Sequence, residues 1–180
     1  MFNPQRDRLV TEAKWWERAT FAHHQWLKGS SPEKSFADCS TFVAGCFRAV
    51  GIFMADVPSL PPDWFLHTRK EWYLEELQKH ALQYAVTETG LEQLRQDAEQ
   101  NGKPYFPTVH TPQPGDIVIV KDTAIGAKVF SHGCIVVEWP IVIHCFPPCV
   151  MRSNIHTYPA FSGRKLKFFD PFAVTTDVKG

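Results

Sequence analysis

Apolar residues recur at helical spacing in the first part of the chain. Residues 8–27 and 70–84 each carry apolar side chains along one helical face, and a shorter helical pattern covers about 90–100. The breaker residues Gly29-Ser30-Ser31-Pro32 follow the first of these patterns. The apolar spacing therefore predicts helices in all three stretches.

The most regular apolar stripe follows Cys39. Its period is near 3.6 residues, as on one face of an α-helix, and Gly51 is well placed to end that helix. Asp38 and Ser40 both stand where an N-terminal cap belongs. We therefore expect Cys39 to lie in the first turn of a helix or directly before it. The stripe consists of Phe42, Val43, Cys46, Phe47 and Val50.

The last part of the chain consists of short β-branched runs separated by turns. The turn residues Pro112-Gln113-Pro114-Gly115 precede the first run, where we expect Asp116 to act as a structural cap. A tight turn at Trp139-Pro140 separates two later runs. The predicted strands are 117–120, 133–138, 141–146, 150–155 and 166–169.

Helices followed by consecutive strands predict an α+β fold, in which N-terminal helices pack on a central antiparallel β-sheet. The length favours a single domain over 1–180. Within this domain, about 54–112 form an α-rich insertion between the helix at Cys39 and the strands.

Charge and composition exclude several classes of protein. The chain has 19 Lys and Arg against 19 Asp and Glu, which argues against nucleic acid as a partner. No apolar run approaches the roughly 20 residues that span a bilayer, and the polar N-terminus lacks the apolar core of a signal peptide. We therefore expect no membrane span and a protein that is cytoplasmic as synthesised. Five cysteines, an odd number, predict free thiols.

The candidate chemistry begins with Cys39. A cysteine is nucleophilic as a thiolate, and its pKa falls at a helix N-terminus or beside an imidazolium. His132 and His144 open one predicted strand and close the next, so we expect them to face each other across a hairpin. One imidazole would accept the thiol proton while the other orients the first. The alternative is that Cys39 is a small buried apolar residue.

A metal site is the competing interpretation of the strand region, which contains His132, Cys134, His144, Cys145 and Cys149. Adjacent strand residues point to opposite faces, and no Cys-x-x-Cys spacing is present. We therefore predict neither a metal nor a cofactor. For His23 and His24 we expect a surface or cleft-wall position.

Four short motifs occur in a characteristic order along the chain. They are Asp38-Cys39-Ser40, Pro114-Gly115-Asp116, Ser131-His132-Gly133 and Ile143-His144. This order resembles the NlpC-type family of cell-wall cysteine peptidases over roughly 15–150. It is most similar to the members encoded in prophages and tail modules, which carry an α-rich insertion with a segment like Pro62-Asp63-Trp64-Phe65-Leu66-His67.

The resemblance implies a papain-like fold with a Cys-His-His triad. In it Cys39 is the nucleophile, His132 the general base and His144 the residue that orients the base. The backbone N–H of Cys39 is the expected oxyanion donor. The substrate-binding residues that the resemblance implies are Asp38, Ser40, Trp64 and His67.

The implied substrates are peptidoglycan stem peptides, cut at the bond between D-glutamate and the diamino acid. The sequence departs from the family where Ala19-Thr20-Phe21-Ala22 replaces a segment that carries an active-site tyrosine, and Thr41-Phe42 replaces Gly-Leu. Two other functions stay open, namely an acyltransferase on the same scaffold and a non-catalytic tail or wall-binding module. The expected setting is a phage tail, or export by a secretion system other than the general one.

Overall fold

The structure is a computed structural model of the chain, and it describes residues 3–55 and 60–173. In these residues the helices are α1 (Pro4–Trp15), α2 (Cys39–Ala49), α3 (Trp64–His67), α4 (Trp72–Leu77) and α5 (Glu88–Asn101). The strands are β1 (Thr20–Phe21), β2 (Trp26–Leu27), β3 (Phe36–Ala37), β4 (Leu82–Ala85), β5 (Tyr105–Val109), β6 (Ile117–Lys121), β7 (His132–Glu138), β8 (Ile141–Phe146), β9 (Cys149–Asn154) and β10 (Lys165–Asp170).

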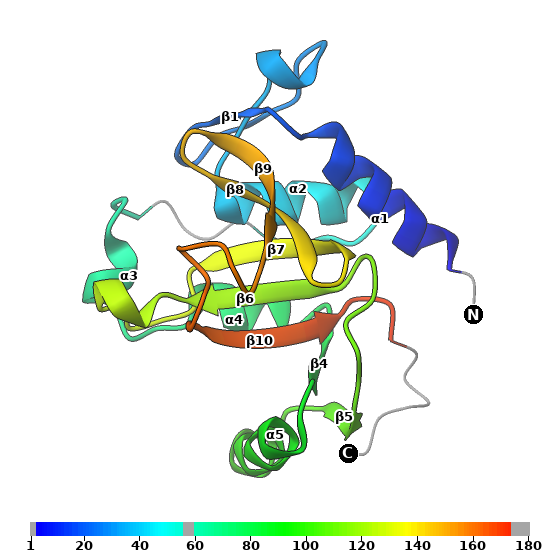
Figure 1. Cartoon of the computed structure of the whole chain (residues 1–180), viewed down its shortest axis with the longest axis vertical. Coiled ribbons are helices and arrows are strands. Elements are labelled where there is room, and N and C mark those ends of the chain that lie inside the picture. The colour runs from blue at the N-terminus through cyan, green and yellow to red at the C-terminus, as the bar shows by residue number, and fades with distance from the viewer. Residues whose placement is uncertain (1–2, 56–59, 174–180) are drawn as a thin grey trace.

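All strands of the described residues belong to one sheet, in the order β2-β3-β1-β9-β8-β7-β6-β10-β4-β5. The central strands β9, β8, β7, β6 and β10 are antiparallel to their neighbours, and parallel pairs occur only toward the two ends, at β1/β3 and β4/β5. Figure 1 shows β6, β7 and β10 at the centre of the molecule, with α1 and α2 beside β7. The α+β fold with a central antiparallel sheet is confirmed.

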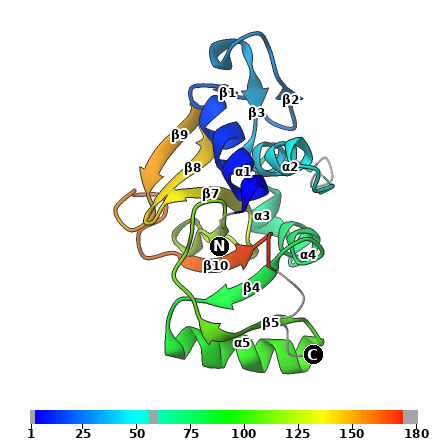
Figure 2. The ribbon, with the colours of Figure 1, turned by 90° about the vertical axis from the view of Figure 1, so that its right-hand side faces the viewer.

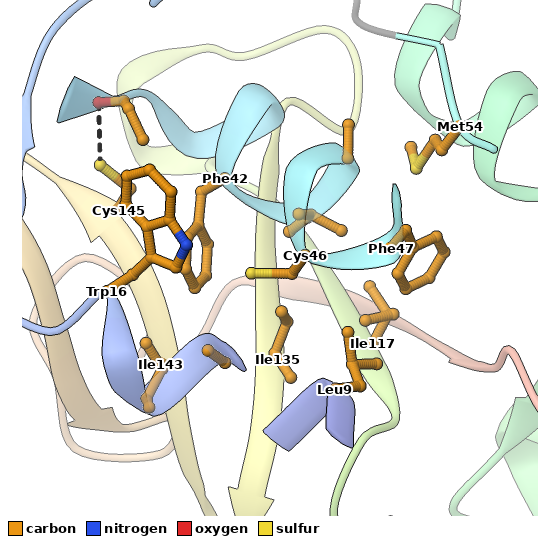
Figure 3. Close-up of a cluster of buried hydrophobic side chains, with 14 of the residues drawn as sticks. Leu9, Trp16, Phe42, Cys46, Phe47, Met54, Ile117, Ile135, Ile143 and Cys145 are labelled. Atoms are coloured by element: carbon orange, nitrogen blue, oxygen red, sulfur yellow. Dashed lines mark hydrogen bonds between the residues drawn. The ribbon is translucent and has the colours of Figure 1, made fainter. Parts of the chain in front are cut away.

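The central sheet is buried on both faces. One face packs under α1 and α2, and Figure 3 shows Phe42, Cys46 and Phe47 of α2 opposite Ile135 of β7. On the other face, side chains of β4 to β8 and of β10 form a second apolar cluster, which Phe161 from the loop after β9 covers. Burial on both faces explains why β6 reads as a continuous apolar run instead of an alternating one.

The predicted helix over 8–27 is wrong beyond Trp15. Arg18 has a positive φ of 77°, and the chain then leaves the helix direction to form β1, whose Thr20 pairs with Cys149 of β9. The short strand β2 follows and pairs with β3. Pairing with distant parts of the chain therefore outweighs the helical spacing of the apolar residues.

The predicted helix over 70–84 is also only partly correct. The helix α4 stops at Leu77, and the segment that follows becomes β4, which is antiparallel to β10. The helix predicted at about 90–100 is confirmed as α5. The middle of the chain thus adds two strands, β4 and β5, to the sheet, and Figure 2 shows α5 lying below β5. The described residues include no helix long and apolar enough to cross a membrane.

Asp116 joins three separate parts of the chain. Its Oδ2 accepts hydrogen bonds from the Gln113 amide at 2.8 Å and from the Tyr84 hydroxyl at 2.7 Å. Its other oxygen pairs with Arg6 of α1, which also contacts Asp170 at 2.6 Å. The expected structural role of Asp116 is confirmed, because the carboxylate ties α1 to the start of β6.

Two phenylalanines test which apolar contacts hold α2 on the sheet. Phe47 is fully buried, whereas Phe53, a few residues later, is 74% exposed. Phe47→Ala should lower the free energy of unfolding by roughly 3–5 kcal/mol, because it removes a buried ring and leaves a cavity. Phe53→Ala should change it by less than about 0.5 kcal/mol. Urea unfolding monitored by circular dichroism measures both, and equal losses would contradict the packing described here.

Candidate active site

Cys39 is the first residue of α2, as the apolar pattern predicts. The Asp38 Oδ1 atom accepts hydrogen bonds from the amides of Ser40 and Thr41, at 3.0 and 2.8 Å. In return the Thr41 hydroxyl accepts the Asp38 amide at 2.8 Å, which completes a capping box. Reciprocal hydrogen bonds between Asp38 and Thr41 therefore fix the first turn of the helix, and with it the position of Cys39.

His132 and His144 are in contact, although their register differs from the prediction. The residue directly opposite His144 is Cys134, two positions from His132. A bulge between Val136 and Glu138 moves the register along the hairpin. Because side chains alternate with a period of two, His132 still lies on the same face as Cys134. The predicted direct opposition is wrong, but the expected meeting of the two imidazoles is found.

The imidazoles form a chain of hydrogen bonds that ends on Ser153. His132 Nε2 lies 3.1 Å from His144 Nδ1, and His144 Nε2 lies 2.9 Å from the Ser153 hydroxyl. His144 is fully buried and packs against Phe161 at a ring distance of 4.6 Å. When each Nε2 donates its proton along this chain, the lone pair of His132 Nδ1 is left free to accept a proton.

Cys39 and His132 open onto the same cleft, which has a volume of about 320 Å³. The Cys39 thiol donates a hydrogen bond of 3.4 Å to the carbonyl of Ser131, the residue before His132. The walls of the cleft are mainly aromatic and apolar, and they include Phe21, Trp64, Phe65, Phe146 and Phe161. A nucleophile and a candidate base therefore face one largely apolar space.

The surroundings of the Cys39 thiol act against the effect of the helix N-terminus on its pKa. Burial, and next the charge of the Asp38 carboxylate, raise the pKa of Cys39 to about 12. The backbone N–H groups of Ser40 and Cys39 oppose this shift, but desolvation of the thiolate outweighs them. At neutral pH the resting sulfur is therefore a neutral thiol.

The imidazoles are uncharged as well. Burial lowers the pKa of His132 to about 4, although the Asp38 carboxylate opposes that shift. Burial and then the charge of His132 lower the pKa of His144 to about 2. Both rings are therefore neutral at pH 7, and His132 is in the protonation state that a general base requires.

The four predicted substrate-binding residues do not all reach the cleft. Asp38, Ser40 and Trp64 line it. His67 is exposed and lies outside the lining, with its Nε2 at 3.0 Å from a carboxylate oxygen of Asp63. For all four residues, contact with substrate stays a prediction.

The structure does not gather the histidines and cysteines of the strand region around one point. Cys145 points to the carbonyl of Ala37, to which its thiol donates a hydrogen bond of 3.2 Å (Figure 3). Among the described residues, the group whose ligand atoms lie close enough to share a metal ion is instead His23, His24 and Asp38.

Two contributions to the site have no signal in the sequence pattern. Ser153 reaches His144 from β9, across a strand pairing that spacing alone does not specify. Tyr73 of α4 packs on Gly133, where an added Cβ would lie only 1.9 Å from the Tyr73 hydroxyl. That buried hydroxyl has no hydrogen-bond partner among the described residues. Glycine next to His132 is therefore required by the close approach of the tyrosine.

No protein-family model and no curated protein matches the sequence. Solved structures do share its architecture. An NlpC protein from Trichomonas vaginalis is 14% identical with a TM-score of 0.57, over 94% of this chain and 47% of its own. RipD from Mycobacterium tuberculosis, a non-catalytic NlpC/p60 domain protein, is 8% identical with a TM-score of 0.53, over 93% of this chain and 98% of its own. The chain has the NlpC/P60 fold.

A third structure with this fold is an N-acetylmuramoyl-L-alanine amidase from Bacteroides uniformis. It is 12% identical with a TM-score of 0.51, over 93% of this chain and 99% of its own. The present chain thus spans nearly the whole of the amidase and of RipD, but less than half of the Trichomonas protein. The solved structures that are similar to this chain therefore include an amidase and a non-catalytic NlpC/p60 protein described as adapted to peptidoglycan binding.

The raised thiol pKa predicts how Cys39 reacts with iodoacetamide. Since only the thiolate is alkylated, labelling should be slow at neutral pH and should accelerate about tenfold per pH unit in the alkaline range. Peptide mass spectrometry follows the label on Cys39, and Cys39→Ala confirms its assignment. Fast labelling that is independent of pH between roughly pH 6 and 8 would show a preformed thiolate and contradict this description.

Proposed function

We propose that the chain is a cysteine peptidase or amidase that hydrolyses peptidoglycan stem peptides through Cys39, His132 and His144. The bond between D-glutamate and the diamino acid is the proposed point of cleavage. The observation that carries this proposal is the shared cleft, which is lined both by a thiol at a helix start and by an imidazole whose Nε2 is hydrogen-bonded to a second imidazole. The structural similarity to an N-acetylmuramoyl-L-alanine amidase and to RipD, described as adapted to peptidoglycan binding, supports the choice of substrate class.

In the proposed reaction the thiol loses its proton as it attacks. Cys39 Sγ adds to the amide carbonyl while His132 Nδ1 takes the thiol proton, so that no free thiolate accumulates. The Cys39 amide is the first N–H of α2 and has no acceptor within the helix, so it can donate to the oxyanion. His132 then protonates the leaving amine, and a thioester on Cys39 remains.

Hydrolysis of the thioester uses the same groups in reverse. His132 removes a proton from water as the water oxygen attacks the thioester carbonyl. The carbon–sulfur bond then breaks, and the Cys39 sulfur takes the proton from His132, which restores the thiol and the neutral ring. His144 keeps the His132 ring oriented throughout, and Ser153 does the same for His144. Once His132 has taken the proton, its positive charge is attracted by the Asp38 carboxylate. This attraction stabilises the protonated ring in the intermediate.

A second candidate is a binding module without catalysis. Two observations favour it, namely the raised pKa of Cys39 and the fold shared with the non-catalytic RipD. In that case the aromatic walls of the cleft would hold a wall peptide without cutting it. Association with a phage tail and export outside the general route stay predictions.

Cleavage of wall peptides distinguishes these functions. The protein should cut a stem peptide that contains γ-D-glutamyl-diamino acid, and Cys39→Ala should lower kcat/KM by at least about 10⁴-fold, since the nucleophile is lost. Cys149→Ala is the matched control, because Cys149 is partly exposed but does not line the cleft. Mass spectrometry of the products locates the bond that is cut.

Each candidate function predicts a different result in this assay. Cleavage that persists in Cys39→Ala would disprove the mechanism. Binding to purified peptidoglycan without any cleavage would support the binding module, and transfer of the acyl group to an added amine in preference to water would support an acyltransferase.

A further inference from the structure

Two adjacent histidines stand over the cap of the nucleophile helix. His23 and His24 lie in the turn between β1 and β2, and their rings are 3.9 Å apart. His24 has a positive φ of 56°, a left-handed conformation in which Asn, Asp and His are enriched among residues other than glycine. One nitrogen of each ring faces the same carboxylate oxygen, since both Nδ1 atoms lie near Asp38 Oδ2, at 3.8 and 3.9 Å.

The opposite nitrogens of these rings lie against the backbone of Leu60. The Nε2 atoms of His23 and His24 lie 3.1 and 2.9 Å from the carbonyl oxygen of Leu60. The Leu60 amide also donates to His24 Nε2 at 3.0 Å, so the backbone of Leu60 offers this nitrogen a donor in one tautomer and an acceptor in the other. In the tautomer in which both Nε2–H groups donate to the carbonyl, both Nδ1 lone pairs point toward Asp38.

That arrangement is how metal-binding histidines are oriented in proteins. Such a histidine donates its second ring N–H to a backbone carbonyl or carboxylate, which fixes the tautomer and the direction of the lone pair. The Leu60 carbonyl is in this position for both rings. The distances from Nδ1 to Asp38 are too long for direct hydrogen bonds, which leaves room between the three atoms.

Asp38 retains a free lone pair for a cation. Its Oδ1 atom accepts hydrogen bonds from the Ser40 amide, the Ser40 hydroxyl and the Thr41 amide. Its Oδ2 atom accepts one, from the His24 amide at 2.6 Å. Since an ionised carboxylate has about four lone-pair sites, Oδ2 can bind a cation while the helix cap stays intact.

The donor set and its spacing fit zinc and its neighbours in the first transition series. The three ligand atoms lie within 4.8 Å of one another. Zinc bonds of about 2.0–2.1 Å in tetrahedral geometry place ligand atoms about 3.4 Å apart. Each Nδ1 therefore has to move about half an ångström closer to Asp38 Oδ2, and the two imidazoles have to turn so that their nitrogens reach the same spacing. Two imidazoles and one carboxylate are a ligand set that zinc accepts. Because His23, His24 and Asp38 all line the cleft, a remaining position would face it.

We propose that His23, His24 and Asp38 bind one divalent ion of the zinc class, with an open position toward the cleft that contains Cys39. That position would take water or an oxygen or nitrogen donor of a ligand. The sequence alone predicts no metal, because it does not show that this turn meets Asp38. The proposal is independent of hydrolysis, since it concerns an ion bound to residues outside the triad.

Titration of the metal-free protein with Zn²⁺ in a calorimeter tests the site. The wild type should bind one equivalent. His23→Ala and His24→Asn should each lower the affinity for Zn²⁺ at least about tenfold. Loss of a residue that only hydrogen-bonds to a metal ligand already has an effect of about this size. Asparagine at position 24 tolerates the positive φ, so this variant keeps the turn while removing the imidazole. His67→Ala is the matched control, because His67 is an exposed histidine outside the cleft, and it should bind as the wild type does.

A second pair of measurements separates this site from the triad. The double variant of Cys39→Ala and His132→Ala should still bind one Zn²⁺. Co²⁺ added to the wild type should give the visible bands of nitrogen and oxygen ligation without the intense near-ultraviolet band of a cobalt–thiolate bond. Absence of Zn²⁺ binding by the wild type, loss of binding only in the triad variant, or a thiolate band that disappears in Cys39→Ala would each overturn the proposal.

Discussion

The Asp38 carboxylate joins the start of α2 to the turn before β2, and its charge shifts the pKa values of groups in the cleft. One oxygen caps the helix that presents Cys39, and the other accepts the His24 amide at 2.6 Å. Its negative charge also raises the pKa of the Cys39 thiol and opposes the lowering of the His132 pKa. A buried carboxylate must have its hydrogen bonds satisfied, so the two segments that supply them are brought to the same place. The site is therefore assembled around an anion.

Burial decides how such a site can react. A helix N-terminus by itself favours a thiolate, yet desolvation in this cleft has the larger effect, and both Cys39 and His132 are neutral at pH 7. Charge then appears only when the proton moves from sulfur to nitrogen during attack. The relay through His144 to Ser153 fixes the orientation of the ring that takes this proton. The largely apolar walls of the cleft strengthen each of these electrostatic interactions, because they lower the local dielectric constant.

The features that sequence analysis predicts well are local. Helix α2 follows from one apolar stripe and its cap, and β6 to β9 follow from β-branched runs between turns. Other features depend on partners far away in the chain: β1 forms where Thr20 meets Cys149, and β4 forms where it meets β10. The contact between Ser153 and His144 and the meeting of His23 and His24 with Asp38 arise in the same way. The raised pKa of Cys39 reflects the cleft around it, which spacing along a helix does not describe.

The protonation of His132 and His144 is the central claim of this account. Long-range proton–nitrogen correlation spectra of the histidine side chains at pH 7 measure it directly, with His132→Gln and His144→Gln assigning the signals. Both rings should be neutral, each with its proton on Nε2, and His132 Nδ1 should carry a lone pair. An imidazolium at His132, with protons on both nitrogens, would mean that the resting site is a thiolate–imidazolium pair and would contradict the account.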